Sequence, residues 1–552
     1  MLEQNLVEYF EKSLKTHWNL KAFSNYNANT IEYSEVADRI LFLHKFFEEI
    51  GVKKQDKIAL IGKNSINWAI TYLATVTYGA VIVPILPDFQ AADVHHIVNH
   101  SGSIMLFSEN SKFDDLDCDA MKNIKAVISL KDLSVINASK SHNSVSKKYA
   151  VAEKTYLAAY PEGINADNFS LPKIPNKELA AIVYTSGTTG FSKGVMILHN
   201  ALISNIVFAM ENMQLKAKDR IVSFLPIAHV FGCAFEFLFP FCSGCHITFL
   251  TKVPSPRIIV KAFSDVKPRL ILSVPLIIEK IYRKQINPTL QKHSIEILRK
   301  IPGTKQLINK KINQKLSTVF GENFREIVIG GAALNDEVES FLNEIGFRYT
   351  VGYGMTECAP LISYQAWDTF AKGSVGRIVD NMEIRIDSND QHNEIGEILV
   401  KGQNVMVGYY RNEEATKLAF TEDGWLRTGD LGIIDQDGNI FIKGRSKSMI
   451  LGPSGKNIYP EELEAKLCNL DYISEAVVID RDHKLVALVY PDYETVDQEN
   501  LEEKDLIKIM EHNRQKLNKT LPSYMKITKI ELRSTEFEKT PKKSIKRYLY
   551  TN

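Results

Sequence analysis

The chain has 552 residues, of which 45% are hydrophobic and 24% are charged, and its formal net charge is +1. A chain of this length and composition is expected to fold into more than one globular domain. The balanced charge argues against a nucleic-acid-binding protein, and six cysteines are too few for a disulfide scaffold. Because the N-terminal segment lacks the apolar core of a signal peptide, we expect a cytoplasmic protein.

Helix-like and strand-like segments alternate over most of the first 430 residues. This alternation is typical of an α/β fold with mainly parallel sheets flanked by helices. In residues 69–86, Gly79 and Pro84 divide an uncharged run into a helix and a strand, so we expect buried core rather than a membrane span. Residues 139–148, "SKSHNSVSKK", are polar and predict an exposed loop.

The stretch "YTSGTTGFSKG", residues 184–194, follows an apolar strand and has the composition of a phosphate-binding loop. Its glycines permit close approach of the backbone to a ligand, its hydroxyls and amides donate hydrogen bonds, and Lys193 adds a positive charge. It differs from the Walker pattern, because the Gly-Lys-Ser/Thr sequence is missing. A surface loop of small polar residues is the alternative, but this dense patterning favours a polyphosphate site.

Two further stretches have alternative interpretations. Residues 224–250 are largely apolar and contain Glu236, so a buried helix and strand are expected. Within them, "CSGCH" at 242–246 matches the c-type haem attachment pattern, yet nothing else in the chain indicates export to an oxidising compartment, and a second Cys pair for zinc is absent. Residues 283–316 hold nine Lys or Arg against one Glu. We favour a solvated helix face for them, with peripheral contact to an anionic membrane as the alternative.

The alternation of helix-like and strand-like segments changes near Arg445. A hairpin with its turn at Asp437 and Gly438 precedes this point, and the remainder is typical of a small α+β unit. We therefore predict a large domain over residues 1–444 and a small C-terminal domain over residues 445–552.

Taken together, these landmarks make the chain resemble the acyl-adenylate-forming enzymes, which include acyl-CoA synthetases, luciferase-like enzymes and peptide-synthetase adenylation domains. The phosphate loop is followed, in the family's order, by "LPIAHVFG" (225–232), "GGAAL" (330–334), "VGYGMTE" (351–357), "RTGDLG" (427–432) and "GRSKSMI" (444–450). The segment "SVPLIIEKIYRK" (273–284) looks most like the long-chain fatty acyl-CoA synthetase branch. The resemblance spans nearly the whole chain. It implies ATP-dependent activation of a medium- or long-chain fatty acid to acyl-AMP, followed by thioester formation with CoA.

The resemblance also implies roles for single residues. Glu357 would bind Mg²⁺ with help from Thr185, because a hard cation prefers oxygen ligands, and His229 would lie beside the acyl carboxylate as a further catalytic residue. Val274 and Gly352 would line the acyl channel. The residues implied in ATP binding are Thr185, Ser186, Gly187, Thr188, Thr189, Gly190, Lys193, Gly331, Ala332, Tyr353, Gly354, Thr356, Asp430 and Arg445. Of these, Lys193 would meet the phosphates, Tyr353 the adenine, and Asp430 and Arg445 the ribose.

The small domain is expected to be mobile. The segment "RSKSMI" resembles the family's hinge, which places the pivot at Lys447, although many relatives have an acidic residue where this chain has Ser448. The domain would present one face for adenylation and another for thioester formation. In the second pose, the loop at 452–455 would help to form the passage for CoA.

The tail "KTPKKSIKR", residues 539–547, departs from the family's C-terminal motif, Lys-Thr-x-Thr-Gly-Lys-Ile-x-Arg. Alignment without gaps brings Lys539, Thr540, Ile545 and Arg547 into register and places Ser544 where the catalytic lysine is expected. We predict that Lys543 takes over this role. The alternative is slow adenylation without a catalytic lysine.

Two other functions stay open at this point. One is an acyl-AMP ligase that passes the acyl group to a carrier protein, and the other is an ATP- or acyl-AMP-binding protein with weak adenylation activity. A luciferase-like oxygenase is more remote, because a shared fold does not imply shared chemistry.

Overall fold

The computed structural model describes residues 1–136, 142–185, 193–252, 255–286, 290, 304–451, 457–482, 484–540 and 545–551. Its largest sheet has the strand order β19-β8-β7-β4-β3-β5-β6. The strands from β7 to β6 in this order are parallel, whereas β8 and β19 are antiparallel to their neighbours. The strands are β3 (Lys57–Ile61), β4 (Val81–Ile85), β5 (Met105–Ser108), β6 (Ala126–Ser129), β7 (Leu179–Thr185), β8 (Lys193–Leu198) and β19 (Gly408–Tyr409).

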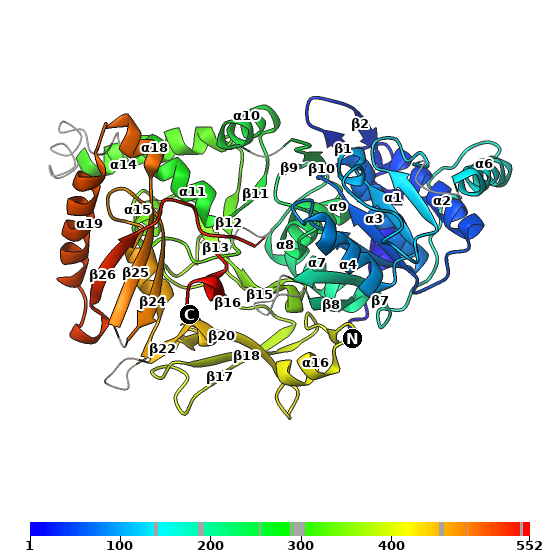
Figure 1. Ribbon diagram of the computed structural model, residues 1–552. Helices are drawn as coiled ribbons and strands as arrows, with labels where there is room; N and C mark the ends of the chain where they lie inside the picture. The colour runs from blue at the N-terminus through cyan, green and yellow to red at the C-terminus, as the bar shows by residue number, and fades with distance from the viewer. Residues whose placement is uncertain are drawn as a thin grey trace.

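Helices flank this sheet at one end of the molecule, and a smaller sheet of order β2-β1-β10-β9 lies beside it (Figure 1). The strands of the smaller sheet are β1 (Lys21–Asn25), β2 (Thr30–Glu32), β9 (Arg220–Ser223) and β10 (His246–Phe249). The helices are α1 (Leu6–Thr16), α2 (Tyr33–Ile50), α3 (Ile66–Tyr78), α4 (Ala91–Ser101), α5 (Asn110–Phe113), α6 (His142–Ala159) and α7 (His199–Asn212). This is the α/β architecture that the alternating pattern predicted.

The interpretation of residues 69–86 as a helix and a strand is confirmed. Helix α3 ends at Tyr78, and Gly79 follows it with a φ of 86°. This left-handed conformation is strained for residues with a side chain, so glycine ends the helix cleanly. The chain then enters β4, whose residues are all buried.

The polar segment 139–148 is not an exposed loop throughout, because residues from His142 onward begin helix α6. The side chains of Val145, Ala152 and Tyr156 are buried, and their spacing of seven and four residues places them on one helix face. The Tyr156 ring packs edge-on against Phe42 of α2. Packing against α2, which is distant in the sequence, therefore stabilises a helix in a segment whose composition predicts a loop.

Residues 224–250 form a compact buried unit. A short helix α8 (Val230–Gly232), a π-helix η1 (Cys233–Leu238) and a helix α9 (Phe239–Cys242) lead into β10. Cys242 and Cys245 are buried, and His246 contacts the Ser24 hydroxyl at 2.7 Å, so the "CSGCH" segment is part of the packed core. Across the described ranges, no helix is long and apolar enough to cross a membrane.

The middle of the molecule contains further small sheets. The parallel sheet β11-β12-β13 consists of β11 (Leu270–Ser273), β12 (Glu326–Ile329) and β13 (Tyr349–Val351). Two antiparallel sheets follow, formed by β14 (Tyr353–Gly354), β15 (Leu361–Tyr364) and β16 (Arg377–Ile378), and by β17 (Met382–Asp387), β18 (Gly396–Gly402), β20 (Leu426–Ile434) and β21 (Ile440–Arg445). The helical segments here are α10 (Pro256–Val266), α11 (Pro275–Ile281), η2 (Tyr282–Ile286), α14 (Thr304–Val319), α15 (Asp336–Glu344), η3 (Thr356–Cys358) and α16 (Glu413–Ala419).

The C-terminal part forms a small α+β domain at the opposite end from the large sheet (Figure 1). Its sheet has the order β24-β25-β26, and its core is a cluster separate from that of the large domain. The elements are η4 (Ser446–Ser448), β22 (Ile450–Leu451), β23 (Asn457–Ile458), α17 (Pro460–Leu467), β24 (Ile473–Arg481), β25 (Lys484–Pro491), α18 (Tyr493–Gln498), α19 (Glu503–Asn518), η5 (Ser523–Met525), β26 (Ile527–Leu532) and η6 (Arg547–Leu549). The boundary at Arg445 stays a prediction.

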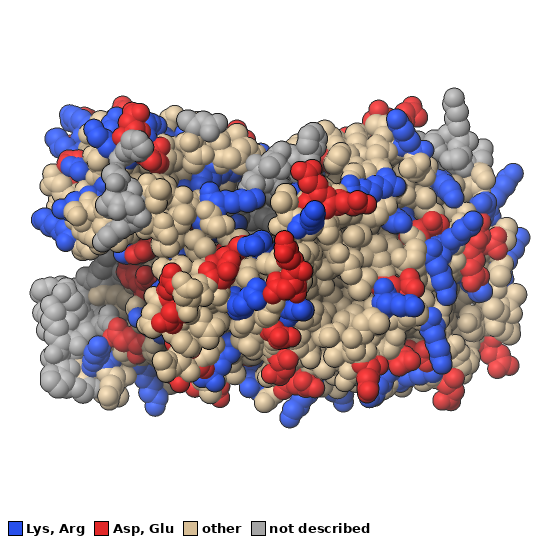
Figure 2. All heavy atoms as spheres, turned by 90° about the horizontal axis from the view of Figure 1, so that it is seen from below, with Lys and Arg blue, Asp and Glu red and all other residues tan. Residues whose placement is uncertain are grey.

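Charges are evenly distributed over the face shown in Figure 2, where acidic and basic side chains are interspersed. This agrees with the formal net charge of +1. A large area of positive charge alone, which would attract polyanions, is not seen on this face.

Glu236 in the π-helix is a carboxyl group inside the core, with 1% of its surface exposed. Burial raises its pKa well above the ordinary value of 4.5, and hydrogen bonds from Ser223 and Leu225 act in the opposite direction. The Leu225 amide donates to its Oε2 at 3.0 Å. The side chain therefore ties the π-helix to the start of the segment that carries His229.

We predict that Glu236→Gln becomes more stable relative to the wild type as the pH rises. The folded protein retains the Glu236 proton at pH values where the unfolded chain has lost it, so this group lowers the wild-type stability progressively above its unfolded pKa of 4.5. Glutamine does not titrate and still accepts from the Leu225 amide. Melting temperatures measured at pH 5 and pH 8 test this.

The exposed Glu162 offers a matched control. The melting temperature of Glu162→Gln should differ from that of the wild type by the same small amount at both pH values. If the difference in melting temperature between Glu236→Gln and the wild type does not change with pH, burial does not raise the pKa of Glu236.

Candidate active site

The carboxyl ends of β11, β12 and β13 meet at one edge of their sheet and bring predicted residues together. The chain leaves these strands at Val274, at Gly330 and Gly331, and at Gly352. The amide of Gly330 donates to the Ser273 carbonyl at 3.0 Å, and that of Gly352 donates to the Ile329 carbonyl at 2.9 Å. Edges of this kind are the usual ligand sites of α/β sheets. The residues implied for adenine and acyl binding are therefore neighbours.

Small residues at this edge leave room for a ligand. Gly331 has a φ of +87°, and Ala332, which follows it, is exposed. Among the described residues, a Cβ atom built on Gly331 would come within 4 Å only of Val274, at 3.9 Å from its Cγ1. The chain thus presents an open backbone surface beside Val274, which suits close contact with a planar group.

The segment that carries His229 packs against the same edge. His229 precedes helix α8, and its Nδ1 accepts a hydrogen bond from the Phe231 amide at 3.3 Å. The Phe231 ring covers Gly330, where an added Cβ would lie 3.1 Å from the ring. Asn64 holds the preceding segment, because its side chain accepts from the Ile227 amide at 3.0 Å. The His229 segment and the "GGAAL" segment are therefore packed together.

A second group of predicted residues meets at Asp430. The Tyr353 hydroxyl donates to its Oδ2 at 2.6 Å, and Arg445 donates from Nε to its Oδ1 at 3.1 Å. Burial raises the pKa of Asp430, and both partners act in the opposite direction, with Arg445 first. Burial also raises the pKa of Tyr353 well above its usual value, and Asp430 adds to this effect, so the phenol stays a neutral donor.

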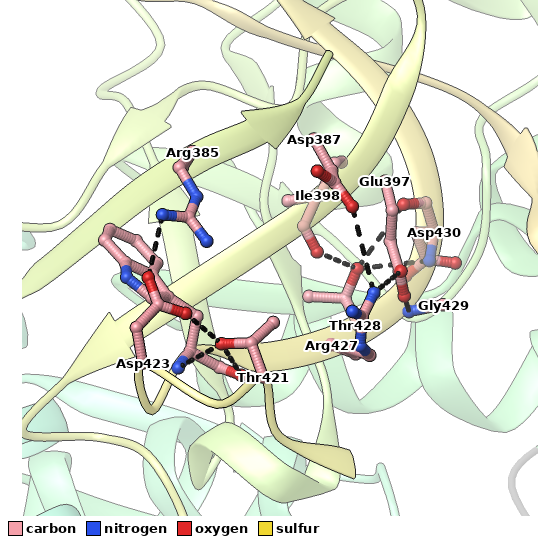
Figure 3. A network of polar contacts seen from close by, with 11 residues as sticks. Arg385, Asp387, Glu397, Ile398, Thr421, Asp423, Arg427, Thr428, Gly429 and Asp430 are labelled. Carbon is pink, nitrogen blue, oxygen red and sulfur yellow. Dashed lines mark hydrogen bonds and ion pairs between the residues drawn. The ribbon is translucent and has the colours of Figure 1, made fainter. Parts of the chain in front are cut away.

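The part of strand β20 that carries Asp430 is held by the neighbouring strand β18 (Figure 3). Glu397 of β18 accepts from the Gly429 amide at 3.0 Å and from Arg427 at 2.8 Å. The Thr428 hydroxyl donates to the Ile398 carbonyl at 2.7 Å and accepts from the Asp430 amide at 3.1 Å. Glu397 was not among the predicted site residues. Its position within "GEILVKG" gave no signal, since its contact with Gly429 follows from strand pairing.

The predicted metal ligand Glu357 and the loop residue Lys193 are joined by Tyr409. The Tyr409 hydroxyl donates to Oε1 of Glu357 at 2.9 Å, and the Lys193 ammonium lies 4.9 Å from the centre of the Tyr409 ring. Thr185 and Lys193 are opposite each other at the ends of β7 and β8. The sequence reasoning missed Tyr409, although the aromatic pair at 409–410 could have drawn attention.

This donor set fits the groups that the resemblance implies. Glu357 offers carboxylate oxygen, and Thr185 offers a hydroxyl, both of which suit Mg²⁺. Lys193 offers a positive charge for phosphate. A carboxylate has more acceptor sites than Tyr353 and Arg445 occupy, so Asp430 retains capacity for ribose hydroxyls. Thr356 is buried beside Glu357, and Gly354 packs closely on Pro360.

Several predicted residues lie outside the described part of the chain. They are Ser186, Gly187, Thr188, Thr189, Gly190, Ser544 and Lys543, together with the loop at 452–455. The predicted hinge residue Lys447 lies in the short helix η4.

The described residues on both sides of 541–544 are firmly attached to the small domain. Lys539 and Ile545 form a β-bridge, and Arg547 donates to both carboxylate oxygens of Glu464, one at 2.6 Å. Arg547 also donates to the Val478 carbonyl at 3.0 Å. The ends of the tail segment are thereby held close together on the small domain.

Comparisons with known proteins agree with these landmarks. A family model described as "AMP-binding enzyme" matches residues 10–410, and one described as "AMP-binding enzyme C-terminal domain" matches residues 447–552. The chain is 29% identical over 468 residues to the "Long-chain-fatty-acid--CoA ligase FadD15" of Mycobacterium bovis, which covers 81% of this chain and 74% of that protein.

Solved structures share the fold. The anthranilate CoA ligase AuaEII, solved with anthranoyl-AMP, has a TM-score of 0.80 against this chain at 18% identity, with 100% of this chain and 97% of that chain covered. The O-succinylbenzoate Coenzyme A Synthetase (MenE) of Bacillus subtilis, solved with ATP and a magnesium ion, has a TM-score of 0.73 at 20% identity, with 99% of each chain covered. The motifs, their arrangement around Asp430 and Glu357, and the family matches lead to one conclusion: the chain belongs to the AMP-binding enzyme family of adenylate-forming ligases.

Proposed function

We propose that this protein is an ATP-dependent ligase that activates medium- or long-chain fatty acids and transfers them to CoA. The proposal rests on two clusters that occur together in one adenylate-forming ligase. They are Tyr353–Asp430–Arg445 and Lys193–Tyr409–Glu357. The first cluster suits a ribose and the second suits a metal-bound polyphosphate. The relative FadD15, named as a long-chain-fatty-acid–CoA ligase, supports the choice of acid.

In the first step, a carboxylate oxygen of the fatty acid attacks the α-phosphorus of ATP, and the bond to the pyrophosphate oxygen breaks. Lys193 would stabilise charge on the phosphates, and Thr356 would donate to the α-phosphate. Bound Mg²⁺ would supply further positive charge near Glu357 and Thr185, as its presence with ATP in the MenE structure suggests. Asp430 would orient the ribose.

In the second step, the deprotonated thiol of CoA attacks the acyl carbon, and AMP leaves. A swing of the small domain about Lys447 would expose the passage for CoA. His229, Val274 and Gly352 would hold the acyl group at the edge of the β11-β12-β13 sheet. Transfer to a carrier-protein thiol is the alternative second step.

We propose further that the protein works in the cytoplasm, with peripheral membrane contact as an alternative. The segment 283–316 carries the basic residues for such contact. Within its described residues, Lys305 pairs with Glu344 at 3.0 Å, and Arg283 donates to the carbonyl of Cys468 in the small domain. These internal contacts favour a structural role for at least part of the segment.

We predict that purified protein releases pyrophosphate from ATP and Mg²⁺ in the presence of C8–C18 fatty acids and consumes CoA thiol in the same reaction. Lys193→Ala prepared in parallel should lower the rate by about 10²–10³-fold, because it removes a group that stabilises transition-state charge. This control excludes a contaminating ligase.

Other outcomes separate the alternatives. Thioester formation only with a carrier protein would favour the carrier-dependent ligase. ATP binding without pyrophosphate release from any acid would refute both ligase proposals, and activity confined to acetate or aromatic acids would refute the fatty-acid assignment.

We predict that Lys543→Ala slows acyl-AMP formation by about 10²–10³-fold and leaves thioester formation from supplied acyl-AMP nearly unchanged. The tail would place this lysine at the carboxylate and the α-phosphate only in the adenylation pose. Lys546, which pairs with Glu538 at 3.5 Å, gives the matched control variant Lys546→Ala. Single-turnover assays of each half-reaction make the comparison.

Equal effects of Lys543→Ala on both half-reactions, or no effect on either, would overturn this role. A Ser544→Lys variant with much faster adenylation would instead show that the native chain lacks an effective catalytic lysine.

A further inference from the structure

Tyr409 occupies a fixed position between two charged residues from distant parts of the chain. Its strand β19 pairs with β8, so that Tyr409 is the cross-strand partner of Val195, two residues after Lys193. The Tyr409 amide donates to the Thr416 hydroxyl at 2.9 Å, which anchors it from the other side. The backbone thus holds this side chain independently of any ligand.

The Tyr409 hydroxyl is a dedicated donor to Glu357. The phenolic hydroxyl donates to Oε1 of Glu357 over 2.9 Å. The Glu357 carbonyl also accepts from the Met406 amide at 2.8 Å, so the segment containing Tyr409 holds both the backbone and the side chain of Glu357.

The face of the same ring holds Lys193. The ammonium lies 4.9 Å from the ring centre, within the range of a cation–π interaction. Within the described chain, no ion pair within 4 Å joins Lys193 to Glu357. A direct pair would neutralise both groups, whereas Tyr409 between them holds each one in place without consuming its charge.

We propose that Tyr409 is a positioning residue that keeps Glu357 ready for Mg²⁺ and Lys193 ready for phosphate. The inference rests on the proposed ATP-dependent function of this site. Residues that hydrogen-bond a metal ligand orient it and tune its basicity, and their loss typically weakens metal affinity by about 10–100-fold. Tyr409 does not itself touch substrate, and it acts through its two neighbours.

The test compares Tyr409→Phe with Tyr410→Phe. Both variants lose one hydroxyl and keep an aromatic ring, but the Tyr410 ring faces Lys57 and Arg411 instead of Lys193. Calorimetric titration with ATP at a series of Mg²⁺ concentrations gives the Mg²⁺ dependence of ATP binding without any acid. We expect Tyr409→Phe to need about 10–100-fold more Mg²⁺ for the same ATP affinity, and Tyr410→Phe to match the wild type.

A second variant, Tyr409→Leu, separates the two contacts. It removes the ring as well, so ATP affinity at saturating Mg²⁺ should fall in this variant and stay near the wild-type value in Tyr409→Phe. Melting temperatures and retained sheet content by circular dichroism show whether each variant is folded. If Tyr409→Leu does not fold, Tyr409→Phe alone decides the question.

An unchanged Mg²⁺ dependence in folded Tyr409→Phe would overturn the inference, whether or not the wild type activates fatty acids. Conversely, a wild type that binds ATP with Mg²⁺ but releases no pyrophosphate would refute the proposed ligase activity. The inference about Tyr409 would then still be supported by its altered Mg²⁺ dependence.

Discussion

The arrangement of this protein's site depends on one buried carboxylate, that of Asp430, between Tyr353 and Arg445. Only 7% of Asp430 is exposed, and a carboxylate that leaves water without partners loses several kcal/mol of solvation. Two donors offset this loss, a phenol at 2.6 Å and a guanidinium at 3.1 Å. Because the donors come from β14 and β21 and the acceptor from β20, one interaction connects three strands at the end of the large domain.

A similar arrangement occurs where phosphate is proposed to bind. Glu357 and Lys193 are charged, and each would bind the other strongly if they met. Tyr409 contacts both and separates them, so the charges stay available for ligands. In each cluster a tyrosine hydroxyl donates to a carboxylate, from Tyr353 to Asp430 and from Tyr409 to Glu357.

Much of the fold was predictable because its signals are local. The end of α3 at Gly79 followed from the conformational freedom of glycine, and the α/β class followed from alternating segments. The helical start of the polar segment after His142 was not predictable, because its stability comes from packing on α2 rather than from its own composition.

The candidate site likewise contains residues that the sequence predicts and residues that it does not. Asp430, Glu357 and Lys193 stand in recognisable motifs, so the sequence alone pointed to them. Tyr409 and Glu397 stand in ordinary strand segments, and their contacts depend on pairing with strands far away along the chain. Such register is a property of the folded sheet, and a single sequence does not reveal it. The role of Lys543 stays a prediction.

Titration of Asp430→Asn with ATP shows whether the site depends on the buried Asp430 carboxylate. Asparagine keeps the shape of the side chain and removes its charge, while Asp387→Asn on the same sheet alters a carboxylate that is 58% exposed. Isothermal titration calorimetry should find ATP affinity reduced at least about tenfold in Asp430→Asn, equivalent to about 1.4 kcal/mol, and unchanged in Asp387→Asn. Equal ATP affinity in the wild type and a folded Asp430→Asn variant would show that the Asp430 carboxylate does not contribute to ATP binding.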